Sequence, residues 1–277
     1  MDTARGLGLQ DHVCWSYDED CEFRRRAREF LVEGLALGQQ VWYVGDGSPE
    51  ALADDLSANR DMGRALRAGA ACVAPVDDAL GPDAVIEPEA RVASYASATE
   101  RALDDGFTGL RVAADVTTVV RKPSQLDAFA RYEHLIDRYM TARPFAALCG
   151  YDRRELGDRA VAEVACMHPN TTRNAAPFRL YASSDPGCSG ELSGEVDLAS
   201  VDLFPLALRR AEPAVVAGDR VVLDGSRLTF IDHRGLVALD DHARERGVPV
   251  VLRTGLSTPA RVIEALNLEN VWAERAA

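Results

Sequence analysis

Residues 30–44 read FLVEGLALGQQVWYV, and this stretch decides the fold class of the first part of the chain. Apolar residues recur at helical spacing up to Leu35, and Gly38 then marks the end of a helix. The run Val41-Trp42-Tyr43-Val44 is rich in β-branched and aromatic residues, which favour a buried strand. The stretch therefore predicts a helix that leads directly into a strand, as in a β-α-β unit.

The same alternation extends in both directions from this stretch. His12–Tyr17 is predicted as a strand, and residues 21–38 as the helix that follows it. Further strands are predicted at 70–76, 109–116 and 145–151, and further helices at 49–56, 87–105, 124–140 and 157–168. Strands separated by helices form parallel crossovers, so we expect a parallel sheet with helices on both faces.

A break in this pattern predicts two domains. Residues 183–187 read SSDPG, which is typical of a linker, and 178–182 are a candidate last strand before it. We therefore expect domains at residues 1–184 and 188–277, in keeping with the usual ~100–200 residues per domain. After the linker, strands are predicted at 190–194, 220–223, 228–231 and 249–252, and helices at 199–210, 235–247 and 258–267.

Composition excludes several classes of protein. Acidic residues outnumber basic ones 44 to 31, and without a basic surface we expect no direct binding of nucleic acid. No apolar run reaches the ~18 residues that a membrane helix needs, and Asp11 and His12 precede any hydrophobic stretch, so we expect no membrane contact and no signal peptide. The six cysteines follow no metal-finger spacing, which favours the cytoplasm, free thiols, no metal and no cofactor.

Three blocks after the linker carry a family pattern. Residues 192–199 read LSGEVDLA, residues 221–224 read VVLD, and residues 228–236 read LTFIDHRGL. In this order they resemble STAS domains, whose blocks run "L-x-G-E-hydrophobic-D" and "I-D-S-S-G-L". The resemblance implies an α/β STAS domain over 188–277 that binds a partner protein, as anti-sigma-factor antagonists do.

The resemblance also identifies a candidate docking loop. It implies partner contacts at Asp232, His233, Arg234 and Gly235. His233 and Arg234 replace two residues that are commonly serine in the family, one of which antagonists phosphorylate, so that phosphoserine switch is not expected here. Asp232 follows a predicted strand and precedes a predicted helix, where its carboxylate would cap the first turn. For His233, a pH sensor, a phosphohistidine and a solvated helix-start residue all remain open.

The first domain resembles a different family. The blocks that carry this resemblance are residues 12–17, 30–44, 106–115, 132–133, 148–154 and 168–169. Together they are similar to the MEDS domain, named for methanogen and methylotroph regulators and the dichloromethane regulator. The resemblance covers about residues 7–182 and implies sensing of a small organic molecule within a signalling protein.

Residues 30–44 also resemble a run found in RecA-like and circadian-clock ATPases. Those enzymes wrap phosphates in a Gly-x-x-x-x-Gly-Lys-Ser/Thr loop between the first strand and the first helix. Here residues 16–22 read SYDEDCE, which contains no glycine, no lysine and four acids. We therefore expect a RecA/KaiC-like parallel sheet without a phosphate loop, and no bound nucleotide.

Candidate ligand-binding residues follow from the expected sheet. Ligands of open parallel sheets bind beyond the carboxyl ends of the strands. The chemistry-bearing residues at those ends are Tyr17, Asp18, Asp46, Asp77, Asp115, Tyr151 and Asp152. Aromatic rings with carboxylates suit a small cationic or polar organic molecule, or a metal, although each acid could instead cap the next helix. His12 and Cys14 share one face of the first strand and are further candidates, with a structural histidine as the other interpretation.

Taken together, these features predict a signal-transduction regulator and not an enzyme. The first domain would sense a small molecule, and the second would bind an anti-sigma factor or another signalling protein. The alternative is an NTPase or hydrolase that uses the strand-end carboxylates with His12 or His168. No Gly-x-Ser-x-Gly, His-Glu-x-x-His or phosphate-loop motif supports that alternative.

Overall fold

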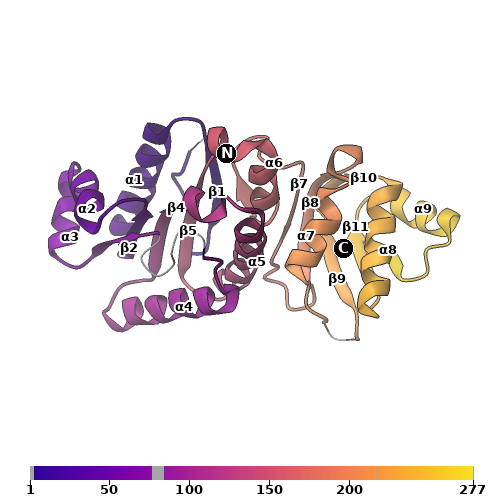
Figure 1. Ribbon diagram of the computed structural model, residues 1–277. Helices are drawn as coiled ribbons and strands as arrows, with labels where there is room; N and C mark the ends of the chain where they lie inside the picture. Colours follow the sequence, from indigo (N-terminus) through magenta and orange to yellow (C-terminus); the bar gives the residue numbers. More distant parts are fainter. Residues whose placement is uncertain (1–2, 77–83, 217, 277) are drawn as a thin grey trace. The chain divides into compact units, whose positions relative to one another are not determined.

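The computed structural model describes residues 3–76, 84–216 and 218–276. They divide into two compact units, each with its own sheet (Figure 1). The first unit comprises Met1–Val164 and Asn170–Ala175, and the second comprises Ala165–Pro169 and Ala176–Ala277. Among the described residues, no helix combines the length and the hydrophobicity that crossing a bilayer requires.

Strands and helices alternate in the first unit, as predicted. Its elements are β1 (His12–Tyr17), α1 (Asp20–Ala36), β2 (Gln40–Gly45), α2 (Pro49–Ser57), α3 (Arg60–Arg67), β3 (Ala71–Pro75), α4 (Pro88–Asp104), β4 (Leu110–Asp115), η1 (Thr117–Val120), α5 (Pro123–Met140), β5 (Phe145–Asp152), α6 (Arg153–Ala165) and β6 (Asn170–Thr171). The sheet runs β3-β2-β4-β5-β1-β6, and all neighbouring strands are parallel. The predicted α/β class is therefore confirmed, whereas α3 and β6 were not predicted.

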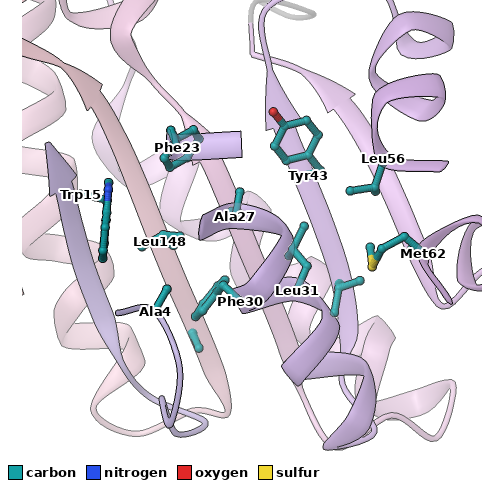
Figure 2. Close-up of a cluster of buried hydrophobic side chains, with 14 of the residues drawn as sticks. Ala4, Trp15, Phe23, Ala27, Phe30, Leu31, Tyr43, Leu56, Met62 and Leu148 are labelled. Carbon is teal, nitrogen blue, oxygen red and sulfur yellow. The ribbon is translucent and has the colours of Figure 1, made fainter. Parts of the chain in front are cut away.

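Helix α1 covers one face of this sheet. Its buried residues recur at helical spacing, and Phe23, Ala27 and Phe30 pack in one cluster with Trp15 of β1 (Figure 2). Gly150 of β5 permits the close approach, because a Cβ there would lie 2.5 Å from the ring of Phe23. Helix α4 lies on the opposite side (Figure 1).

Arg111 of β4 fastens the N-terminal segment to the sheet. Its side chain is fully buried, and Nη2 donates to the carbonyl oxygen of Leu7 at 2.8 Å. Nη1 donates to the carbonyl of Phe30 at 3.2 Å, and Nε donates to Oε1 of Gln39 at 2.7 Å. A buried charge is stable only with such partners, so Arg111 holds three separate segments together.

The second unit contains a mixed sheet. Its elements are β7 (Phe178–Tyr181), β8 (Gly190–Val196), η2 (Leu198–Ser200), α7 (Leu203–Ala211), β9 (Val221–Gly225), β10 (Leu228–Ile231), α8 (His233–Arg246), β11 (Val250–Thr254), α9 (Thr258–Leu266) and β12 (Val271–Arg275). Strands β10-β8-β9-β11-β12 are parallel, and β7 pairs antiparallel with β8. Strand β12 was not predicted from the sequence.

Strand β7 differs from its expected place. Residues 178–182 were expected to end the first domain, but β7 pairs with β8 and belongs to the second unit. Phe178 is buried there, with its ring edge-on to Phe204 of α7 at 5.2 Å between centroids. Burial of Phe178 in the second core accords with the assignment of Ala176–Ala277 to the second unit, which begins before the predicted linker, 183–187.

Candidate functional site

An open pocket of about 360 Å³ lies at the carboxyl ends of the strands of the first unit. We call it the strand-end pocket. Carboxylates outnumber guanidinium groups six to two in its lining, which also includes two tyrosines. These residues are Asp20, Asp46, Asp55, Asp115, Asp152 and Glu155, with Arg24 and Arg121, and Tyr17 and Tyr43. The strong excess of negative charge favours a cationic ligand.

Hydrogen bonds order one wall of the pocket. The Tyr17 hydroxyl donates to Oδ2 of Asp115 at 2.7 Å, and the Thr117 hydroxyl donates to Oδ1 at 2.8 Å. The backbone N–H of Asp152 donates to Oγ1 of Thr117 at 3.0 Å. Burial raises the pKa of Asp115 above its usual value, and the hydrogen bonds from Tyr17 and Thr117 oppose this rise. Burial also raises the pKa of Tyr17, which keeps its hydroxyl a donor at neutral pH.

The structure brings together four of the predicted ligand residues. Tyr17, Asp46, Asp115 and Asp152 line the strand-end pocket. Asp18 is exposed in the loop after β1 and does not line it, while Asp20, in the first turn of α1, does. Asp152 also accepts the backbone N–H of Arg154 at 2.8 Å, so the capping interpretation holds for this acid as well. Asp77, another predicted strand-end residue, lies outside the described residues.

His12 and Tyr151 belong instead to a buried cluster. Nδ1 of His12 lies 3.0 Å from Oδ1 of Asp137, and Nε2 lies 3.1 Å from Oε2 of Glu133. The Tyr151 hydroxyl donates to Oε1 of Glu133. The Cys149 Sγ lies 3.8 Å from Nε2 of His12 and 3.9 Å from Oε2 of Glu133. We call these five residues the His12 cluster, and none is more than 6% exposed.

The electrostatics of the His12 cluster centre on the imidazole. Burial lowers the pKa of His12, but the hydrogen bonds and charges of Asp137 and Glu133 outweigh it and raise the pKa from 6.5 to about 9. Burial raises the pKa of Cys149 and that of Tyr151 well above their usual values. The described residues therefore hold an imidazolium between two carboxylates, beside a protonated thiol.

The register of strands β1 and β5 brings residues of the His12 cluster to one face of the sheet. In the parallel pair β1–β5, Cys14 lies opposite Cys149, and His12 lies opposite Ala147. Alternation along a strand puts His12, Cys14, Cys149 and Tyr151 on the same face. Helix α5 adds Glu133 and Asp137, which stand four residues apart and so face the same way.

Sequence reasoning missed Glu133, Asp137 and Cys149 as site residues. One signal was present, because Glu133 and Asp137 interrupt the apolar face of a helix that also buries Ile136 and Ala130. Two carboxylates on a core-facing stripe indicate a buried partner. Cys14, which was predicted, is buried on the same face of β1, and Sγ of Cys149 lies 3.8 Å from Nε2 of His12.

The second unit has a surface groove of about 390 Å³ along α7 and α8. We call it the α7–α8 groove. His233 and Arg234 are exposed and line it. Asp232 caps α8, as predicted, by accepting the backbone N–H of Gly235 at 2.9 Å. Gly235 is buried, and a Cβ there would lie 2.7 Å from Cγ1 of Val196, so this glycine serves packing.

Comparison with known proteins identifies the first part of the chain. A family model described as "MEDS: MEthanogen/methylotroph, DcmR Sensory domain" matches residues 11–169, which include the strand-end pocket and the His12 cluster. Among solved structures, the flagellar accessory protein FlaH from Methanocaldococcus jannaschii is similar, with 13% identity and a TM-score of 0.41 over 65% of this chain and 76% of that one. No curated protein sequence matches. Because the family model covers more than half of the 277 residues, the chain belongs to the MEDS family.

Proposed function

We propose that this chain is a cytoplasmic signal-transduction protein and not an enzyme. Its MEDS domain would bind a small organic cation in the strand-end pocket, and its second unit would bind a protein partner. The observation that supports ligand sensing is the pocket lining, in which carboxylates outnumber guanidinium groups six to two beside two tyrosines. The six free cysteines are consistent with a reducing compartment.

The chemistry of the pocket favours an ammonium group. Carboxylates such as Asp46 and Asp55 would attract its positive charge, and tyrosine rings favour alkylammonium groups through cation–π contacts. A nucleoside triphosphate carries the opposite charge. Repulsion from the carboxylates would therefore oppose ATP binding, which is the premise of the alternative NTPase function.

The partner-binding half of the proposal rests on the α7–α8 groove and on the STAS-like blocks at 192–199 and 228–236. Val201 lines the groove and is 38% exposed, and Leu198, three residues earlier in η2, is 63% exposed. Arg234 adds a cation suited to bidentate pairing with a carboxylate. We therefore propose an anti-sigma factor, or another signalling protein with an acidic and apolar surface, as the partner.

Ligand binding can be tested with a pair of probes that differ in charge. Choline and its neutral isostere 3,3-dimethylbutan-1-ol would be titrated into the full chain by calorimetry. We expect choline to bind at least ~10-fold more tightly, which corresponds to about 1.4 kcal/mol. Asp46→Asn should weaken choline binding, whereas Asp18→Asn, a change of the same type outside the pocket, should not. Equal affinity for the two probes would contradict the proposal.

ATP provides the test of the enzyme alternative. We expect no binding of Mg-ATP below millimolar concentration and no release of phosphate. Micromolar binding accompanied by hydrolysis would replace the sensor function with an NTPase function.

Partner binding can be tested with matched bait proteins. Wild type, Arg234→Glu and Arg261→Glu would each capture proteins from the native cytosol, followed by affinity measurement for any protein that wild type retains. Arg234→Glu should weaken that complex by about 2 kcal/mol or more if the ion pair is desolvated. Arg261 is exposed on α9, and its substitution serves as the control. Equal binding by all three baits would exclude the α7–α8 groove as the docking surface.

A further inference from the structure

We propose that the His12 cluster binds a divalent transition-metal ion, with Nε2 of His12, Oε2 of Glu133 and Sγ of Cys149 among its ligands. This site is separate from the strand-end pocket and goes beyond the function proposed above. The three atoms lie within 4.8 Å of one another. Their separations are 3.1, 3.8 and 3.9 Å.

These separations are close to those of a coordination sphere. With metal–ligand bonds of about 2.0–2.3 Å, two ligands of a tetrahedral ion lie about 3.3–3.6 Å apart. Each observed separation differs from that range by a few tenths of an ångström. The described side chains thus form one triangular face of a tetrahedron with little rearrangement.

The combination of donor atoms selects the class of metal. An imidazole nitrogen, a thiolate sulfur and a carboxylate oxygen are the ligands that Zn²⁺ uses in proteins. Thiolates favour zinc and similar transition metals, whereas magnesium and calcium take oxygen ligands. The presence of Cys149 therefore indicates a zinc-like ion.

Two further residues hold the ligands in place. Asp137 lies 3.0 Å from Nδ1 of His12, which directs Nε2 toward Glu133 and Cys149. Tyr151 donates to Oε1 of Glu133, which leaves Oε2 facing His12. A carboxylate behind a ligating histidine and a hydrogen bond to a ligating carboxylate are recurrent supports of metal sites. Asp137 and Tyr151 are therefore positioning residues.

The charges also suit an ion in this buried place. An incoming divalent ion would displace one proton from His12 and the thiol proton from Cys149. Before uptake the His12 imidazolium and the Glu133 and Asp137 carboxylates sum to −1, and after uptake the ion, the Cys149 thiolate and the same two carboxylates also sum to −1. Uptake of the ion therefore adds no net charge to side chains that are at most 6% exposed, where an added buried charge would be costly.

A purely structural ion pair is the competing explanation. His12 between Glu133 and Asp137 would be satisfied without a thiol. Cys149 lies within 4 Å of both His12 and Glu133, a third converging donor that an ion pair does not need and a metal ion can use. The two explanations differ in whether the site takes up metal.

Cobalt titration of the full chain distinguishes them. After removal of metals with a chelator, Co²⁺ should bind with a near-ultraviolet cobalt–thiolate charge-transfer band, and Zn²⁺ should abolish the band by displacement. Cys149→Ser should lose the band, whereas Cys72→Ser, on β3, should retain it. Asp137→Asn should retain the band but bind Co²⁺ about 10–100-fold more weakly.

Each outcome decides the proposal. Wild-type protein that takes up no Co²⁺, or binds it without the thiolate band, would overturn it even if every variant failed to fold. A band that survives in folded Cys149→Ser would do the same, with folding checked by circular dichroism. Choline titration of the metal-stripped chain reports on the strand-end pocket separately, so failure of one proposal is distinguishable from failure of the other.

Discussion

The His12 cluster and Arg111 of the first unit differ from the α7–α8 groove of the second unit in how deeply their charged side chains are buried. In the first unit, charged groups such as Arg111, Glu133 and His12 are fully buried, and each has partners from distant segments. In the second unit, His233 and Arg234 lie exposed along a surface groove. A buried charge needs its partners for the fold itself, whereas an exposed one does not. Function and stability should therefore be coupled in the His12 cluster and separable in the α7–α8 groove.

The largest expected change in the free energy of unfolding comes from removing β7 from the second unit. Fragment 176–277 should be more stable than fragment 188–277 by about 3–6 kcal/mol, because Phe178 and Leu180 are buried and each such side chain contributes about 1.5–3 kcal/mol. Urea unfolding followed by circular dichroism measures the difference. Equal stability would restore the predicted boundary at 183–187 and remove β7 from the second core.

Glu133→Ala tests the buried chemistry of the first unit. In the presence of a chelator it should lower the free energy of unfolding by about 3–5 kcal/mol, because His12 and Tyr151 lose a buried charged partner. Glu100→Ala is the matched control, since its ion pair with Arg143 is exposed and such pairs contribute about 0–1 kcal/mol. If both variants unfold alike in chemical denaturation, the contrast between the units is wrong.

His242 is an exception within the second unit, and its pH dependence sharpens the comparison. Burial lowers the pKa of His242 below 6.5, and Arg246 and Arg209 lower it further, while Glu245 and Glu212 oppose them. The neutral ring is therefore favoured in the folded state. Its contribution to stability is present above the unfolded pKa of about 6.5 and is lost as pH falls through the lower folded pKa.

The role of His242 is checked by comparing the pH dependence of the stability of wild type and of a His242 variant. Wild type and His242→Gln would be unfolded in urea at several values from about pH 5 to about pH 8. Wild type should lose more stability toward the acid end than the variant does. Parallel curves would show that protonation of His242 does not contribute.

The smallest change in the free energy of unfolding is expected for Arg234→Glu. Its side chain is 47% exposed and lies 4.0 Å from Asp232, so the free energy of unfolding should change by about 0.5 kcal/mol or less. Thermal or urea unfolding measures this. A large loss of stability would mean that Arg234 contributes to the folded core. Weaker partner binding by this variant would then result from unfolding and not from loss of a contact with the partner.

Local signals explain how much of the fold could be predicted. Gly38, which stops the predicted helix, has a φ of +77° that favours glycine, and α1 and β2 fall within a few residues of the prediction. Strand β7 was also recognised, but its pattern of alternating apolar residues does not specify which sheet it joins. Strand β6 has two residues, too few for any period to emerge.

The candidate site residues also differ in whether a local sequence signal could predict them. Tyr17, Asp46, Asp115 and Asp152 could be predicted because parallel strands bring their carboxyl ends to one edge. The approach of Glu133 to Cys149 could not be predicted, because it depends on how α5 packs against β5. The periodicity of apolar residues in a short stretch of sequence does not show which helix packs against which strand.

The position of β1 has a consequence for how the chain folds during synthesis. It is the first strand of its sheet to be made, yet it lies between β5 and β6, the last two strands of that sheet to be made. At about 5–20 residues per second, β1 would wait on the order of ten seconds for its neighbours to leave the ribosome. During that interval the run HVCWSY, which is buried throughout in the folded chain, has neither of its native neighbours, so its apolar side chains stay without their native packing until β5 is made.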